Sequence, residues 1–339
     1  MKHRRLDRSN PLPAEPMGLA GGNLKVTLPE YAYFEGSIVP YSEAKVGVLT
    51  HSLNYGTAAF GGLRGYWNDE QQQLFVFRPL DHYERLLNSA KLLCSENTYT
   101  TEGLRDITFE LLRKEGLNED CYIRPLLYKS DEIIGVKLHD LTDEISIVAV
   151  PFRKYVKNDD SAHVTISSWR RVDDNVMPAR GKISGAYVNT AFVKTDALRA
   201  GFDEALVLNN DGHLSEGSAE NVFMLRNGEL VTPPVTDNIL EGITRRTVIE
   251  LAREELGMEV VERSIDRTEV FLADELFLTG TAAKITAVTR VDFRDIGTGK
   301  MGSVTQQLRE IYEDIVRGKH SKYAHWVEAV YESEPEAVN

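Results

Sequence analysis

Several segments of the chain carry apolar residues at helical spacing. In 81–94 the apolar positions fall on one stripe, and Asp81 is the expected N-cap of that helix. Gly116, Gly201 and Gly257 stand where later helices are expected to end. The predicted helices are 81–94, 101–116, 187–200, 242–257 and 304–318.

Runs rich in β-branched and aromatic residues alternate with these helices. Asn210-Asp211-Gly212 and Asn227-Gly228 both lie between such runs, where they are strong signals of β-hairpins. Because hairpins dominate, we predict an α+β fold of two domains with mostly antiparallel sheets and flanking helices. The clearest expected strands are 62–67, 73–79, 121–128, 145–152 and 163–169.

A polar, aperiodic segment at 153–162 separates two halves that each contain helices and strands. The N-terminal stretch is rich in proline and lacks periodicity, which is typical of a tail. The predicted division is a tail at 1–25, a small α/β domain at 26–155, a linker at 156–162 and a larger domain at 163–339.

The composition is that of an ordinary globular protein of 339 residues, with 42% hydrophobic and 27% charged residues. A net charge of −13 disfavours nucleic acid as a partner, because an acidic surface repels phosphate backbones. There is no apolar run that would span a membrane and no secretory signal core. The two cysteines, Cys94 and Cys121, form no C-x-x-C pair, so we expect a cytoplasmic protein.

Common catalytic motifs are absent from the sequence. The segment 297–302 resembles a phosphate loop, but Met301 follows its lysine where a serine or threonine is required. No dinucleotide fingerprint follows a strand, and no G-x-S-x-G elbow occurs. The histidines show no zinc-binding spacing, so no metal is expected.

Lys182 stands out because its neighbours are small and almost uncharged. Gly181, Ser184 and Gly185 surround it, at the junction of a β-like run and a helix. Most lysines lie on solvated surfaces. The alternative is a desolvated amine that forms a Schiff base, with glycines giving room for a flat cofactor.

Two glutamates occur in the segment 214–223, directly after a predicted hairpin turn. Glu216 and Glu220 are either solvated strand residues or buried carboxylates that need a partner. A protonated pyridine nitrogen is such a partner.

Two further segments are suited to an anion. Gly242, Ile243 and Thr244 begin a predicted helix, whose free N–H groups attract negative charge. The segment 278–283 adds Thr281 among small residues.

Taken in order, the lysine, S-E-G-x-x-E-N, G-I-T-R and G-T-A-A resemble the class IV aminotransferases, which are pyridoxal-phosphate enzymes of fold type IV. The likeness extends from about residue 30 to 325 and is greatest to the branched-chain amino acid aminotransferases. It implies pyridoxal 5′-phosphate held by the larger domain. The implied roles are Schiff-base formation by Lys182, contact of Tyr187 with the phenolic oxygen, contact of Glu216 with the pyridine nitrogen, and phosphate binding by Arg85, Ile243, Thr244 and Thr281.

The resemblance assigns the substrate mainly to the smaller domain. Tyr122 and the backbone of Ala282 and Ala283 would hold the α-carboxylate, and Arg124 would receive the distal carboxylate of glutamate. Tyr55 and Val136 would reach the pocket of a neighbouring subunit. The implied substrate residues are Tyr55, Phe60, Gly62, Arg64, Tyr122, Arg124, Val136, Phe152, Tyr155, Ala282 and Ala283.

Two positions depart from the family pattern. Gly61 replaces the usual glutamate of F-E-G, and Asn54 stands where many members have histidine. Gly61 bears on the pocket wall and therefore on substrate range.

The resemblance implies ping-pong transamination of leucine, isoleucine and valine with 2-oxoglutarate by a homodimer or a dimer-based hexamer. One alternative is a D-amino acid or (R)-amine aminotransferase on the same scaffold. Another is an acidic binding or scaffold protein without activity. The combination of Tyr55, Phe60, Gly62 and Arg64 with Tyr122 and Arg124 favours the branched-chain group.

Overall fold

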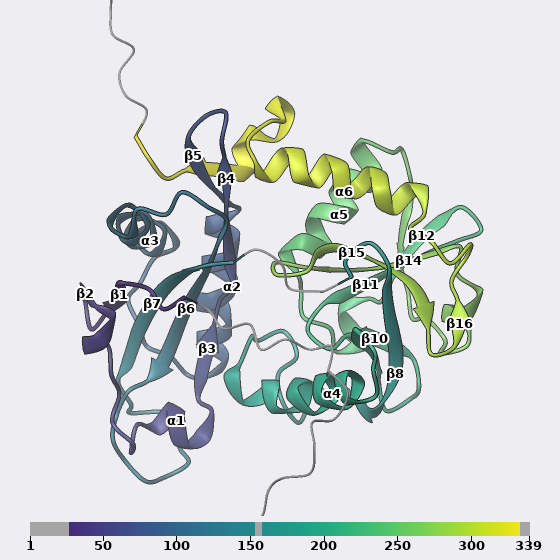
Figure 1. The fold of residues 1–339 in the computed structure, drawn as a ribbon. Coiled ribbons are helices and arrows are strands. Elements are labelled where there is room, and N and C mark those ends of the chain that lie inside the picture. Colours follow the sequence, from purple (N-terminus) through teal and green to yellow (C-terminus); the bar gives the residue numbers. More distant parts are fainter. Residues whose placement is uncertain (1–26, 153–157, 333–339) are drawn as a thin grey trace, which may run out of the picture.

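The computed structural model describes residues 27–152 and 158–332, which form two β-sheets with helices packed against them (Figure 1). The predicted tail at 1–25 and the predicted site residue Tyr155 lie outside these residues. Residues 31–151 and a late strand at 327–329 build the first sheet, and residues 162–295 build the second. The predicted domain boundaries stay a prediction. Within the described ranges, no helix combines the length and apolarity needed to cross a bilayer.

The first sheet is antiparallel throughout. Its strands are β1 (Tyr31–Phe34), β2 (Ser37–Pro40), β3 (Ala58–Phe60), β4 (Leu63–Asn68), β5 (Gln73–Phe77), β6 (Cys121–Lys129), β7 (Asp143–Pro151) and β17 (Val327–Ala329). The strand order is β17-β5-β4-β6-β7-β1-β2, and β3 pairs with β6. The helices of this half are η1 (Tyr41–Glu43), α1 (His51–Tyr55), α2 (Pro79–Leu92) and α3 (Thr101–Glu115). Leu86 of α2 and Leu112 of α3 share one apolar core with Ile123 and Ile147 of the sheet.

The second sheet mixes the two directions. Its strands are β8 (Ala162–Arg170), β9 (Glu204–Leu208), β10 (Leu214–Gly217), β11 (Asn221–Arg226), β12 (Glu229–Thr232), β13 (Val260–Glu262), β14 (Glu275–Gly280), β15 (Lys284–Val291) and β16 (Arg294–Asp295). The order is β10-β9-β8-β15-β14-β11-β12-β13, with β16 on β15. The pairs β8–β9, β8–β15 and β12–β13 are parallel, and the others are antiparallel.

Helices cover this sheet on more than one side (Figure 1). They are η2 (Ser184–Ala186), α4 (Tyr187–Arg199), η3 (Val235–Asp237), α5 (Ile243–Glu254), η4 (Glu269–Leu272), α6 (Ser303–Val316) and η5 (Ser321–Trp326). Val248 of α5 and Leu308 of α6 pack with Phe223 and Phe277 in one core. Val193 of α4 packs on Val207 in another.

The predicted hairpins and most predicted helix ends are confirmed. β9 and β10 pair antiparallel around Asn210-Asp211-Gly212, and β11 pairs with β12 around Asn227-Gly228, both of which have positive φ. Gly116 caps α3 in the left-handed conformation. The prediction that Asp81 caps α2 is wrong, because Pro79 fits the first helical position and starts the helix two residues earlier.

The C-terminal segment ties the two sheets together. After α6 the chain returns to the first sheet, where β17 pairs with β5. Arg317 binds both oxygens of Asp120 at 3.0 Å, and its Nη1 donates to the carbonyl of Trp67 at 2.6 Å. A bidentate arginine–carboxylate pair has a fixed geometry, so these contacts fix α6 against β4.

Candidate active site

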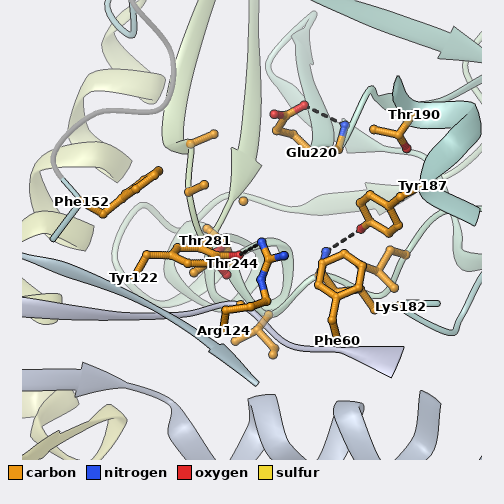
Figure 2. A pocket seen from close by; sticks show the side chains of 18 of the residues that line it. Phe60, Tyr122, Arg124, Phe152, Lys182, Tyr187, Thr190, Glu220, Thr244 and Thr281 are labelled. Atoms are coloured by element: carbon orange, nitrogen blue, oxygen red, sulfur yellow. Dashed lines mark hydrogen bonds between the residues drawn. The ribbon is translucent and has the colours of Figure 1, made fainter. Parts of the chain in front are cut away.

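A cavity of about 740 Å³ is lined by residues of both halves of the chain (Figure 2). It gathers segments that are far apart in sequence, including β3, β6 and β7 of the first sheet and β10, β14 and the start of α5 of the second. The predicted residues that line it are Phe60, Gly62, Arg85, Tyr122, Arg124, Phe152, Lys182, Tyr187, Glu216, Ile243, Thr244, Thr281, Ala282 and Ala283.

Lys182 extends its amine into this cavity. Its backbone is fixed against the first half, since its carbonyl accepts from Phe60 N at 2.9 Å and its N–H donates to Ser89 Oγ at 3.0 Å. The amine lies 2.6 Å from the hydroxyl of Tyr187. Burial, and after it the positive charges of Arg85 and Arg124, lower the pKa of Lys182 to about 7. A reactive neutral amine is therefore available near neutral pH.

Gly185 contributes differently from the expectation that it clears space beside Lys182. Its N–H donates to the carbonyl of Gly56 at 3.1 Å, and a side-chain carbon on Gly56 would lie 2.8 Å from the Cα of Gly185. Two glycine backbones therefore pack directly on each other. This contact sets the position of η2, and with it the spacing of Lys182 and Tyr187.

Glu216 is buried in the same cavity, with 4% of its surface exposed. Arg171 lies 3.0 Å from its Oε1, and Oε2 accepts from the backbone N–H of Leu240 at 3.0 Å. Burial raises the pKa of the Glu216 carboxyl, and Arg171 opposes that shift. The interpretation of Glu216 and Glu220 as solvated strand residues is wrong, because both are buried.

The start of α5 presents free backbone N–H groups to the cavity. Gly242 is the N-cap and has no side-chain cap. A side-chain carbon at Gly242 would lie 2.0 Å from Oδ1 of Asn221, so any other residue here would displace the Asn221 amide. Thr244, Thr281 and Arg85 surround this helix start. Backbone N–H groups, hydroxyls and a guanidinium together form a donor set for a phosphate.

Comparison with known proteins agrees with this geometry. The model of the amino-transferase class IV family matches residues 66–291. The chain belongs to the class IV aminotransferase family. A probable branched-chain-amino-acid aminotransferase of Aquifex aeolicus (strain VF5) is 49% identical over 303 residues, which cover 89% of this chain and 97% of that protein.

Two solved structures show the same fold as this aminotransferase. A branched-chain aminotransferase of Thermoproteus uzoniensis, solved with norvaline, is 44% identical with a TM-score of 0.86, over 89% of this chain and 100% of that one. The T.th. branched-chain amino acid aminotransferase, complexed with N-(5′-phosphopyridoxyl)-L-glutamate, is 38% identical with a TM-score of 0.84, over 89% and 99% of the two chains.

The aminotransferase cavity also contains residues that the sequence analysis missed. Arg171 forms an ion pair with Glu216. It is the second of the two consecutive arginines that follow the expected strand 163–169, and these two arginines were the available sequence signal. Val148 and Val150 face the cavity because β7 pairs them with Arg124 and Tyr122 of β6. Period-two alternation in both strands indicates this shared face.

Among the predicted substrate residues that the structure describes, three do not line the cavity of their own chain. Arg64 lies behind it and donates to the carbonyls of Ala282 and Phe152, each at 3.2 Å, so it supports two lining residues. Tyr55 and Val136 lie on the surface, and Val136 is 83% exposed. Their predicted role in a neighbouring subunit stays a prediction.

Proposed function

We propose that this class IV aminotransferase transfers the amino group of leucine, isoleucine or valine to 2-oxoglutarate by a ping-pong mechanism. The observation that carries this proposal is the Lys182 amine, which lies 2.6 Å from the Tyr187 hydroxyl in a cavity that Glu216 also lines. The relative from Aquifex aeolicus is named for branched-chain amino acids, and the two structures contain norvaline and phosphopyridoxyl-glutamate.

The residues present fit pyridoxal 5′-phosphate, the cofactor of this enzyme class. Lys182 would supply the amine that bonds it, and the buried Glu216 carboxylate would suit a protonated ring nitrogen. The α5 start, with Thr244, Thr281 and Arg85, suits the phosphate. When bound, the cofactor withdraws electrons from the substrate's Cα.

The chain's own residues have separable tasks in this reaction. Lys182 Nζ would take the proton from the substrate's Cα and deliver it to the cofactor carbon that is bonded to the transferred nitrogen. The Tyr187 hydroxyl orients that amine through its 2.6 Å contact. Burial, and then the charge of Glu216, raise the pKa of Tyr187, so it keeps its proton and can donate to an oxygen anion.

The other side of the cavity suits both the apolar side chain of a branched-chain amino acid and the side-chain carboxylate of glutamate. Phe60 and Phe152 supply apolar walls, together with Val148 and Val150. Arg124 lies over the ring of Phe60 at 4.7 Å and donates to the Tyr122 hydroxyl at 3.2 Å (Figure 2). A carboxylate can replace that hydroxyl as the acceptor, which avoids the cost of an unpaired buried charge.

Exposed apolar side chains support a homodimer. Val48, Leu53, Ile134 and Val136 are exposed around α1 and the β6–β7 connection. The hydroxyl of Tyr55 accepts from Gly135 N at 3.2 Å and joins these two segments. An exposed apolar surface of this kind is typical of an interface between subunits. We also propose that the enzyme is cytoplasmic.

Gly62→Ala tests the carboxylate-binding side. A side-chain carbon there would lie 2.1 Å from the Tyr122 hydroxyl, so Tyr122 has to shift. We expect the KM for L-leucine to rise about tenfold, since overpacking costs roughly 1–3 kcal/mol. Steady-state kinetics measure the change, and the cofactor's visible absorption serves as the control. An unchanged KM would remove Gly62 and Tyr122 from substrate binding.

The pH dependence of cofactor capture tests the state of Lys182. Only the neutral amine attacks an aldehyde, and its pKa of about 7 means that the neutral form prevails above that pH. The rate at which the cofactor-free protein captures pyridoxal phosphate should therefore rise with pH around 7. Arg124→Gln removes a positive charge and should move the midpoint upward, whereas Arg199→Gln, on the exposed end of α4, should not. A midpoint near that of an ordinary lysine would contradict the assignment.

Substrate preference tests the proposed function against its alternatives. Initial rates with L-leucine, D-alanine and (R)-1-phenylethylamine are compared at saturating 2-oxoglutarate. We expect L-leucine to be preferred by kcat/KM. Preference for either other amine would show a D-amino acid or (R)-amine aminotransferase, and absence of a cofactor band would show a protein without this chemistry.

A further inference from the structure

The turn between β14 and β15, residues 281–283, lines the cavity and is held from outside. The next residue, Lys284, has a φ of 56°, a left-handed conformation that few residues other than glycine adopt. Surrounding contacts must therefore hold the chain in this shape. Arg64 of β4 donates to the carbonyl of Ala282 at 3.2 Å, and the Lys284 amine donates to Oε1 of Glu313 on α6 at 2.6 Å.

Ion pairs connect these two contacts to each other. Oε2 of Glu313 lies 3.8 Å from Nε of Arg317, which is four residues further along the chain. Arg317 binds both oxygens of Asp120 at 3.0 Å, and Asp120 lies 3.7 Å from Arg64. Positive and negative charges thus alternate along an ion-pair series, and both ends of the series are attached to the same turn. Its members are Lys284, Glu313, Arg317, Asp120 and Arg64.

The buried ring of Tyr66 lies against all three cations of the ion-pair series. The cationic groups of Lys284, Arg64 and Arg317 lie 5.3, 5.2 and 5.8 Å from the centre of this ring. The face of an aromatic ring attracts cations, so Tyr66 stabilises their common arrangement. Its hydroxyl lies 3.3 Å from that of Tyr312, which attaches the ring to α6 as well.

The burial of the ion-pair series makes it more than a set of surface contacts. Exposed ion pairs contribute little to stability, because water screens them. Here every member side chain is at most 30% exposed, and that of Arg64 is 1% exposed. Charges that share partners in a partly buried network also support one another. Displacing one link is therefore expected to affect the turn at the end of the series.

We propose that the ion-pair series positions the turn 281–283 to bind the α-carboxylate of the substrate, with Glu313 as the positioning residue on α6. The inference rests on the proposed function, which assigns that carboxylate partly to the backbone of Ala282 and Ala283. The structure describes all of α6, and none of its residues lines the cavity. The helix thus contributes to substrate binding only through the turn.

Glu313→Gln breaks the ion-pair series at a partly exposed link. We expect the KM for L-leucine to rise about fivefold, with kcat changed by less than about twofold, because ground-state binding is lost. The inhibition constant of 4-methylpentanoate, which has the carboxylate but no amine, should rise by the same factor. Removal of a negative charge would by itself strengthen the binding of an anion, so the direction of change separates positioning from a direct effect of charge.

Asp314→Asn is the matched control, because it removes the same charge from the adjacent, exposed position of α6. A second control is 3-methylbutylamine, which has the amine and the apolar chain of leucine but no carboxylate. The concentration at which it changes the visible band of the loaded protein should be the same in both variants. An unchanged or lower KM for L-leucine in Glu313→Gln, or an equal loss of affinity for 3-methylbutylamine, would overturn the proposal.

Lys284→Gln breaks the same link from the side of the turn and should raise the same two constants. Since both substitutions remove one contact, the double variant should show no more than the larger of the two single effects. The cofactor's visible band and the melting temperature verify that each variant is folded. Effects of the two substitutions that multiply in the double variant would contradict a shared contact.

Hydrogen exchange in the cofactor-free chain tests the positioning without any reaction. Peptides that contain residues 281–283 should exchange faster in Glu313→Gln than in wild type or in Asp314→Asn. Unchanged exchange would overturn the inference and leave the proposed function intact. Faster exchange with unchanged binding of L-leucine and 4-methylpentanoate would overturn it differently, because the turn would then have no part in binding the carboxylate that the proposed function assigns to it.

Discussion

Lys182→Ala is expected to lower kcat for the transamination of L-leucine by about 10⁴-fold, the upper range for loss of a positioned acid–base group. The variant loses both the amine that bonds the cofactor and the group that moves the Cα proton. The fold should persist, because the amine is desolvated and its hydrogen bond to Tyr187 is a single contact. Steady-state assays, with the visible absorption of the loaded protein, measure the loss.

The control for this substitution is Lys91→Ala, an exposed lysine near the end of α2. It should keep both activity and absorption. If Lys182→Ala keeps the visible band and turns over normally, another amine bonds the cofactor and the site is misassigned.

Glu216→Gln is expected to lower kcat by roughly 10²–10³-fold, in the range measured for loss of one preorganised electrostatic contact. The amide keeps the size of the side chain and still accepts from Leu240 N, but it has no charge to hold a proton on the ring nitrogen. The effect should fall mainly on kcat, since Glu216 is not among the residues assigned to the substrate. Single-turnover and steady-state rates with L-leucine separate the effect on kcat from any effect on KM.

Arg171→Gln provides an independent check on the same carboxylate. It removes the guanidinium 3.0 Å from Glu216, which raises the pKa of that acid further, and it should reduce kcat in the same direction. Glu110→Gln, at an exposed position on α3, serves as the neutral control. Full activity of Glu216→Gln would mean that the cofactor's ring nitrogen has no need of this carboxylate.

Local patterns predicted the elements well because their causes are local. The hairpin at Asn227-Gly228 needs two positive φ angles that these residue types adopt, and Gly116 ends α3 for the same reason. The cap of α2 was mistaken because two signals competed, and Pro79 at the first position outweighed Asp81 as a cap.

The site could not be built from local patterns, because the residues around the cavity come from distant segments. Arg85, Lys182, Glu216 and Thr281 meet only after two sheets and their helices have packed, and no spacing in the sequence encodes that meeting. The likeness to class IV aminotransferases supplied the grouping.

What that likeness did not supply depends on strand register and packing. Val150 lies beside Tyr122 because β6 and β7 pair in one particular register, and Arg64 lies behind the cavity rather than in it.

The half-reaction of the cofactor-loaded wild-type protein with L-leucine, without any 2-oxo acid, tests the central claim most directly. We predict that the visible absorption band disappears, that 4-methyl-2-oxopentanoate forms in stoichiometric amount, and that 2-oxoglutarate restores the band. A band that L-leucine leaves unchanged while D-alanine or (R)-1-phenylethylamine removes it would contradict the account.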